Sequence, residues 1–213
     1  MVVREQNLAD RGGRAGLAVV LAVTAGVALW FVGAKLALYS SFTPAAYDDL
    51  WPRRVGFLPH MAGGIVAILA GVVQLWLGFT GRTGRLHHVL GRFYVGGVAV
   101  GAAGGFYLAV TIQDGGFAYS AGLFSLALAW ALTTAMAIVA VHRRALRQHR
   151  EWMIRSYIVT FAFVFFRLAH RVVSGWNIAP EAEIATFLAF ASWALPLLLA
   201  EPLIQMRKLR PGG

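Results

Sequence analysis

The chain has 213 residues and a formal net charge of +10, but only 13% of its residues are charged and 59% are hydrophobic. So few charged side chains cannot cover a soluble domain, which excludes an ordinary soluble protein and predicts an all-α integral membrane protein. The chain has no cysteine, which excludes disulfides, thiolate metal sites and covalently attached c-type haem. The arginines lie in short segments between apolar runs rather than on one contiguous face, which excludes a nucleic-acid-binding protein.

Six apolar runs each reach the roughly 20 residues that a membrane-spanning helix needs. In chain order, we expect the spanning helices to cover residues 15–38, 55–79, 89–110, 121–141, 152–173 and 184–200. The first run is far longer than the roughly 7–15 apolar residues of a cleaved signal peptide, so we interpret it as an uncleaved anchor. The connection 39–54 has room only for a small interfacial helix. The sequence therefore predicts one six-transmembrane-helix domain over residues 1–213.

Arginine and lysine are unevenly distributed between the two sides of the predicted bundle. Most of them belong to the side that holds both termini and the loops 80–88 and 142–151. The other side carries Lys35, Arg53, Arg54, Arg167 and Arg171. Because cytoplasmic loops are enriched in arginine and lysine, this distribution predicts that both termini are cytoplasmic.

The histidines fall near the ends of the predicted helices, in two groups. His60 and His170 lie toward the outer side, whereas His87, His88 and His149 lie toward the inner side. His149 and His170 are 21 positions apart on one helix, about 31 Å, so no single cofactor can bind both. The possible ligand pairs are therefore His60 with His170 outside, and His87 or His88 with His149 inside.

Helical phase distinguishes His87 from His88. At about 100° per residue, His60 and His87 each share a helix face with glycines. These glycines are Gly63, Gly64 and Gly71 for His60, and Gly91, Gly101 and Gly105 for His87. Such a face lets a flat macrocycle or another helix approach the backbone closely. The face of His88 carries Arg92 instead, so we prefer His87 as the inward-facing ligand.

This arrangement predicts a b-type haem site. Bis-histidine ligation needs two imidazoles on facing helices, an apolar slot and cations near the propionates. On the inner side these groups are His87, His149, Arg92 and Arg155, and on the outer side the ligands are His60 and His170. Two alternatives stay open. The histidines can be interfacial polar residues beside packed helices, or His87, His142 and His149 can hold zinc or copper.

Two further polar residues stand at the edge of, or inside, apolar runs. Arg167 lies several residues inside its helix, so we expect it to face the bundle interior or to extend toward the headgroups. Glu201 borders the last run at the depth of Arg155 and Arg92, which favours an ion pair with one of them. Gln74 is placed to donate to a ligand or to a neighbouring helix.

The common motifs of soluble catalysis do not occur in the sequence. There is no P-loop, no dinucleotide-binding fingerprint and no serine nucleophile elbow. Carboxylates are nearly absent at the depths of the histidines, which disfavours a zinc hydrolase. The sequence therefore leaves open whether the protein is an enzyme.

Three segments resemble a family of bacterial predicted membrane proteins of unknown function, domain of unknown function 2306. They are the helix with His60 that ends "GVVQLWLG", the segment "LHHVLGRFY" and the segment "HREWMIRSY". In the family's pattern an arginine stands where this chain has His88. The resemblance maps the family's histidines onto His60, His87 and His149 and its arginines onto Arg92 and Arg155, but it does not include His170. It implies a membrane fold and a bacterial cytoplasmic (inner) membrane location, and no activity. The architecture is also similar to cytochrome b561-type proteins, without shared motifs.

The leading hypothesis is a membrane electron-transfer protein that binds haem b and exchanges electrons with a quinol or another redox partner in the lipid bilayer. The first alternative is a non-catalytic subunit or assembly factor that packs its glycine faces against a larger membrane-protein complex. The second is a small transporter or sensor that uses Arg167, Gln74 and Glu201. Pro196 and Pro202 favour the second alternative, whereas the lack of visible inverted repeats disfavours it.

Overall fold

The computed structural model describes residues 2–112 and 115–208, and within these ranges the regular structure is entirely helical. The six long helices are α1 (Val2–Leu38), α3 (Arg54–Phe79), α4 (Arg85–Thr111), α5 (Gly116–His142), α6 (Leu146–Ser174) and α7 (Glu181–Lys208). Each contains a segment long and apolar enough to cross a membrane. The predicted all-α fold with six membrane-spanning helices is confirmed.

The observed helices extend beyond the predicted spans at most of their ends. A helix of 29 residues, such as α6, is about 44 Å long, whereas the hydrocarbon core measures about 30 Å. The extra turns carry polar residues that belong in the headgroup region. A criterion based on apolar runs does not include these turns, although their backbone remains helical.

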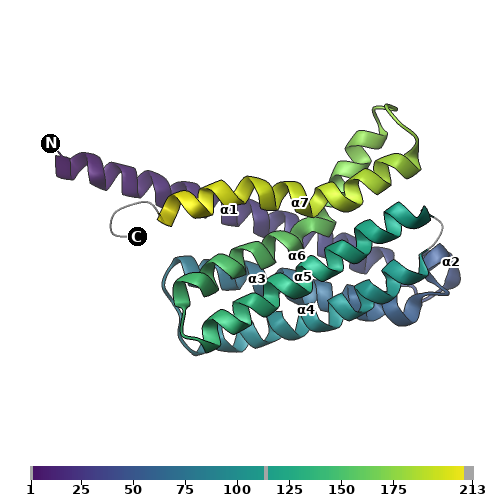
Figure 1. Ribbon diagram of the computed structural model, residues 1–213, viewed down its shortest axis with the longest axis horizontal. Helices are drawn as coiled ribbons and strands as arrows, with labels where there is room; N and C mark the ends of the chain where they lie inside the picture. Colours follow the sequence, from purple (N-terminus) through teal and green to yellow (C-terminus); the bar gives the residue numbers. More distant parts are fainter. Residues whose placement is uncertain (1, 113–114, 209–213) are drawn as a thin grey trace.

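Helices α3, α4, α5 and α6 lie side by side, and α7 packs against α5 and α6 (Figure 1). Helix α1 packs mainly on α3 and is the least buried of the six spans. The connection between α1 and α3 contains α2 (Pro44–Tyr47) and the 3₁₀-helix η1 (Asp48–Leu50). These short helices lie where the sequence left room for a small interfacial helix. Its Tyr47 is buried in an aromatic cluster with Tyr39, Phe42, Trp51 and Phe57.

The most extensive helix contact in the described bundle joins α3 to α4, and it depends on glycine. A Cβ atom on Gly63 would lie 2.4 Å from both the Gly97 carbonyl oxygen and the Gly101 nitrogen. Gly104 is similarly close to the backbone of Gly56 and His60. Of the predicted glycine faces, Gly63 and Gly101 meet along this seam, whereas Gly71 faces the Tyr157 ring and a Cβ on Gly64 would meet nothing within 4 Å. The sequence left open whether a glycine face packs against a flat macrocycle or against another helix. At this seam the partner is another helix.

A buried hydrogen-bond network joins α4, α5 and α6. The Tyr94 hydroxyl lies 2.7 Å from Ser156 Oγ and 2.8 Å from Thr160 Oγ1, and Trp130 Nε1 donates to Thr160 Oγ1 at 2.8 Å. Thr160 donates to the Ser156 carbonyl, so its Oγ1 accepts from Trp130 and from Tyr94. Ser156 Oγ also lies 2.7 Å from Thr134 Oγ1, so it has both Tyr94 and Thr134 as partners. The network therefore fixes the Trp130 and Thr160 side chains in place.

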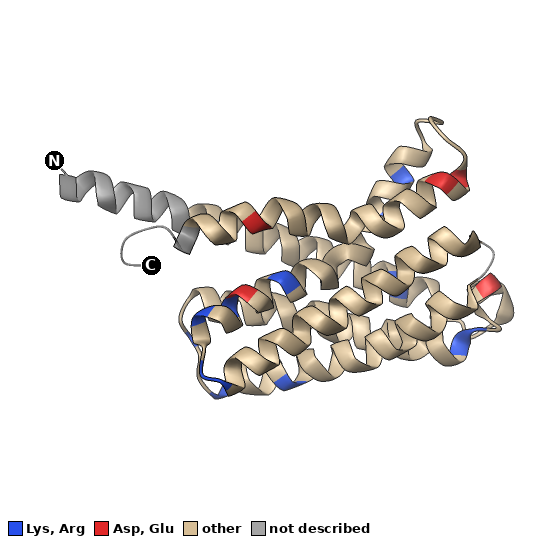
Figure 2. Ribbon diagram, in the orientation of Figure 1, with Lys and Arg blue, Asp and Glu red and all other residues tan. Residues whose placement is uncertain are grey.

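The two ends of the bundle differ in charge. One end, which we call the basic end, carries the α3–α4 and α5–α6 loops with Arg82, Arg85, Arg143, Arg144, Arg147 and Arg150 (Figure 2). The opposite end carries the α1–α3 and α6–α7 connections, and we call it the cavity end because a cavity opens there.

Candidate functional site

Four helices surround a cavity of about 100 Å³ toward the cavity end. Its wall is mostly apolar, and its polar side chains come from α1, α3, α5 and α6. These side chains are Lys35, Tyr39, His60, Trp130, Thr160 and Arg167. A cavity of comparable size, about 150 Å³, is known to hold a ring as large as benzene. The space therefore suits a small ring or a compact headgroup rather than a whole macrocycle.

His60 stands on α3 at the α3–α4 seam, and its ring orientation is fixed. Its Nδ1 lies 2.8 Å from the carbonyl oxygen of Gly101. A carbonyl only accepts, so Nδ1 carries the hydrogen and Nε2 of the neutral ring keeps a lone pair. The edges of Trp130 and Phe163 flank the imidazole at centroid distances of 6.3 and 5.8 Å. This packing requires Gly105, whose Cβ would lie only 3.3 Å from His60 Nδ1.

Two cations from different helices line the same cavity. Lys35 of α1 and Arg167 of α6 are close enough for their like charges to interact. The Arg167 guanidinium also lies over the rings of Phe163 and Phe166, at 5.4 and 5.8 Å from their centroids. None of the ion pairs found in residues 2–112 and 115–208 involves Lys35 or Arg167. The cavity end therefore concentrates positive charge beside an apolar wall.

Tyr39 adds a neutral donor to this site. Burial raises the pKa of its hydroxyl above the usual value of 10.0, and the nearby Arg167 charge only partly opposes that rise. The hydroxyl therefore stays protonated at physiological pH and can donate a hydrogen bond to a ligand.

The convergence of these residues was not predicted from the sequence. His60 and Arg167 were predicted to have separate roles, and Lys35 contributed only to the predicted orientation of the bundle in the membrane. Lys35 interrupts the apolar segment "FVGAKLAL", which was the available signal for a functional cation. Tyr39, Trp130 and Thr160 gave no signal, because aromatic and hydroxyl side chains are common in membrane helices.

His60 and His170 do not form a pair. His170 Nε2 lies 3.2 Å from Glu181, and its ring stacks on Phe166. Phe166 in turn stacks on Phe163, which contacts His60. Two phenyl rings thus lie between the two imidazoles. The structure does not bring the two predicted outer ligands together, because two phenylalanines of "FAFVFFRLAH" lie between them.

His87 and His149 both lie toward the basic end, at a separation at which a charge on one still affects the other. His149 Nδ1 lies 2.9 Å from the Ala137 carbonyl, so this nitrogen carries the hydrogen and Nε2 is left as a potential ligand. His87 Nδ1 is buried and makes no hydrogen bond within the described part of the chain. Gln74 donates to the His87 backbone carbonyl, as expected for a contact with a neighbouring helix.

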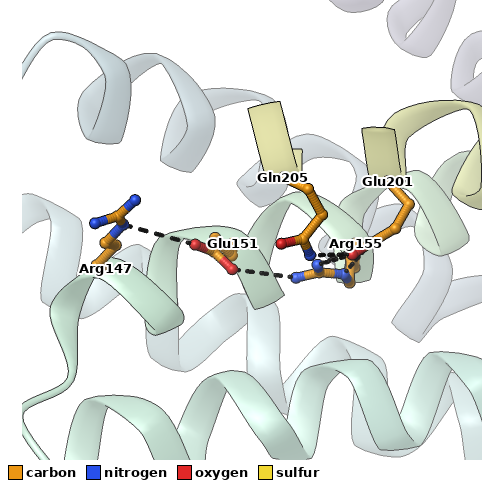
Figure 3. Close-up of polar contacts among 5 residues, drawn as sticks. All are labelled: Arg147, Glu151, Arg155, Glu201 and Gln205. Carbon is orange, nitrogen blue, oxygen red and sulfur yellow. Dashed lines mark hydrogen bonds and ion pairs between the residues drawn. The ribbon is translucent and has the colours of Figure 1, made fainter. Parts of the chain in front are cut away.

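Arg155 and Glu201 form the predicted ion pair, which joins α6 to α7 (Figure 3). Arg155 Nε and Nη2 donate to the two Glu201 oxygens at 3.0 and 2.9 Å. Arg155 also lies 3.8 Å from Glu151, and Glu151 lies 3.9 Å from Arg147. Gln205 donates to Glu201 from one turn later on α7. Arg155 and Glu201 thus hold α6 and α7 together at this depth.

The remaining predicted polar residues are more exposed. Arg92 is exposed and lines a groove on the surface of α3 and α4. His88 and His142 are exposed, and each hydrogen-bonds the carbonyl one turn earlier on its own helix. Across the residues that the structure describes, no three histidine, aspartate or glutamate side chains gather as a metal site would require. The zinc or copper site of His87, His142 and His149 is therefore not formed here.

A family model for predicted membrane proteins, DUF2306, matches residues 57–204. The chain belongs to this family. The matched region runs from α3 into α7 and contains His60, His87, His149, Arg155 and Arg167, whereas Lys35 and Tyr39 of α1 lie before it. No curated protein and no solved structure matches the chain.

Proposed function

We propose that this DUF2306 protein binds a membrane-soluble molecule with a small anionic head in the cavity, and acts as a transporter or sensor for it. The observation that carries the proposal is the convergence of Lys35 and Arg167 on one cavity beside His60, with no carboxylate paired to either among residues 2–112 and 115–208. Two like charges repel each other, and the exposed Arg167 in a membrane-spanning helix is poorly hydrated where lipid surrounds it. An anion between them relieves both costs.

The other cavity groups suit the same ligand. The Tyr39 hydroxyl can donate to an anionic oxygen, and the planar Arg167 guanidinium binds carboxylate or phosphate in bidentate fashion. The apolar wall accepts the first part of a hydrocarbon tail. Since the cavity measures only about 100 Å³, the rest of the tail lies among lipids.

The proposal includes an orientation. The basic end faces the cytoplasm of a bacterial inner membrane, by the excess of arginine in its loops. The cavity then lies in the outer half of the bilayer, and both termini are inside.

A thermal-shift titration of the detergent-purified protein tests the proposal, with laurate as the probe and dodecanol as the uncharged probe of equal chain length. Laurate should raise the melting temperature in a saturable way and dodecanol should not. Arg167→Gln and Lys35→Gln should each weaken laurate binding at least tenfold. Arg171→Gln is the matched control: this exposed arginine one turn later on α6 does not line the cavity, although its charge also acts on Lys35, and its loss should weaken laurate binding much less than Arg167→Gln does. Equal loss in all three variants would show only a general effect of surface charge and would overturn the proposal.

A second candidate is the electron-transfer protein with haem b, exchanging electrons with a membrane quinol. Its support is the inner pair, where a buried His87 Nδ1 lacks a hydrogen-bond partner and the hydrogen-bonded His149 Nδ1 leaves Nε2 free. A carbonyl that orients the other ring nitrogen is a common feature of metal-binding histidines. When bound, the haem would supply a one-electron redox centre. His87 and His149 would hold it near the Arg155 charge.

An optical spectrum of the purified protein, oxidised and then reduced with dithionite, distinguishes the two candidates. Haem binding predicts sharp low-spin reduced bands that His87→Ala and His149→Ala abolish and the exposed control His142→Ala preserves. A colourless protein from haem-sufficient cells would contradict the second candidate and leave the first unaffected.

A further inference from the structure

A second concavity lies on the outer surface of the α3–α4 pair, away from the cavity described above. This groove measures about 570 Å³, within the range of roughly 300–1,000 Å³ for small-molecule sites. Its floor is formed by Ala62, Gly63, Gly96 and Gly97, and Phe93 and Val100 form part of its walls. Phe93 is 60% exposed and Val100 48%, so no other described helix covers it.

The floor is open because of how the two helices cross. Gly63 and Gly97 touch the opposite backbone, which draws the helices together along the seam. Gly96 faces outward, and a side chain built there would meet no atom within 4 Å. A protein that spans a membrane presents such a groove to lipid, and its apolar walls match a hydrocarbon chain.

Arg92 supplies the charge at one end of the groove. It lies seven residues after the first residue of α4, about 10 Å along the helix axis, and it is exposed. No carboxylate pairs with it in the described ranges, and the groove lining contains no acid. Arg85 lies two helical turns earlier on the same face and is also exposed. An arginine at such a depth needs an anion or the headgroup region.

We propose that this groove binds an anionic phospholipid, with one acyl chain over Gly96 and the phosphate between Arg92 and Arg85. The guanidinium of Arg92 binds the phosphate oxygens in bidentate fashion, and phosphate from the leaflet at the basic end lies within its reach. The site is separate from the cavity, since none of the groove residues lines it. The proposal does not depend on the ligand of the cavity.

Native mass spectrometry of the full chain in mixed detergent–lipid micelles tests this inference, with phosphatidylglycerol and phosphatidylcholine as equimolar probes. The wild type should retain one phosphatidylglycerol at least fivefold more often than phosphatidylcholine. Arg92→Gln should abolish that preference. Gly96→Leu, which fills the groove, should reduce retention of both lipids.

The matched control is Arg82→Gln, which removes an exposed arginine of the same end that lies over Trp76 rather than the groove. It should leave the preference intact. Equal losses in Arg92→Gln and Arg82→Gln would overturn the proposal in favour of general surface charge. Unchanged retention in Gly96→Leu would show that the acyl chain lies elsewhere. Bound inorganic phosphate in place of lipid would show that the arginines select a free anion.

Discussion

Arg155 and Arg167 stand on the same helix, 12 residues and about 18 Å apart, and they have opposite surroundings. Arg155 donates to both oxygens of Glu201, lies near Glu151 and stacks on Trp152. Arg167 has only aromatic rings and the like charge of Lys35 beside it, at the edge of a cavity. The first arginine belongs to the structure that holds the bundle together, and the second to a surface that faces a ligand.

The comparison extends to the two ends of the molecule. Toward the basic end, the Arg155–Glu201 ion pair connects α6 to α7. At the cavity end, α1 contributes Lys35 and Tyr39 from the least buried of the spanning helices. Stability and binding are therefore expected to depend on different residues. Four substitutions test this separation, ordered by their expected effect on stability.

The largest effect is expected at the α3–α4 seam. Gly63→Ala places a Cβ atom 2.4 Å from backbone atoms of Gly97 and Gly101, which cannot move away as a side chain would. The helices must separate, at a cost of about 3 kcal/mol or more. The measurement is the melting temperature of the purified protein. Gly64→Ala is the matched control, since its Cβ meets nothing within 4 Å, and it should be neutral or slightly stabilising. Similar melting temperatures for the two variants would contradict the close approach.

The next effect is expected in the buried hydroxyl network. Tyr94→Phe removes one of the two hydroxyl partners of Ser156, which keeps Thr134, and one donor to Thr160. Both partners are buried, so the loss should be about 1–3 kcal/mol. Tyr107→Phe, at an exposed ring of the same helix, removes the same atom and should change the melting temperature by less than a degree or two. Because Thr160 and Trp130 line the cavity, Tyr94→Phe should also weaken laurate binding by less than Arg167→Gln does.

The third effect concerns the Arg155–Glu201 pair. Glu201→Gln removes the charge that Arg155 faces, but the Glu201 side chain is 42% exposed, so solvent screens the pair and the cost should be about 1 kcal/mol. A double-mutant cycle with Arg155→Gln isolates the interaction. A coupling energy near zero would indicate that the contact of α6 with α7 depends on packing alone.

The sequence was sufficient to predict the six helices and an ion pair of Glu201 with either Arg155 or Arg92, of which the structure forms the first. Apolar runs of about 20 residues define spans, and one carboxylate at the depth of an arginine leaves few partners. Depth also placed His87 and His149 toward the same end of the bundle. The two histidines predicted to pair at the other end are not brought together, because depth does not specify which helices are neighbours, and "FAFVFFRLAH" places two phenyl rings between His60 and His170.

The cavity could not be predicted for the same reason. Its polar groups come from four helices, and their convergence depends on how α1 rests on α3 and how Trp130 is fixed by Thr160. The glycine faces were recognised, but one sequence cannot tell whether such a face meets a helix or a cofactor. The positions of Gly63 and Gly101 decide this only when both helices are placed.

The smallest effect on stability is expected for Arg167→Gln, and this substitution tests the comparison most directly. Its charge lies near Lys35 and has no ion pair among the described residues, so the substitution removes only the cation–π contacts with Phe163 and Phe166. The loss of like-charge repulsion offsets that cost, so the free energy of unfolding of the ligand-free protein should stay within about 0.5 kcal/mol of the wild-type value. Arg155→Gln should lower it clearly, because Glu151 and Glu201 would then face each other without a cation between them. If Arg167→Gln instead destabilises the ligand-free protein as much as Arg155→Gln does, Arg167 is a structural residue, and the proposal that the cavity binds an anion is contradicted. If stability is unchanged while laurate binding is lost, the two arginines of α6 have separate roles, one in holding the bundle and one in binding.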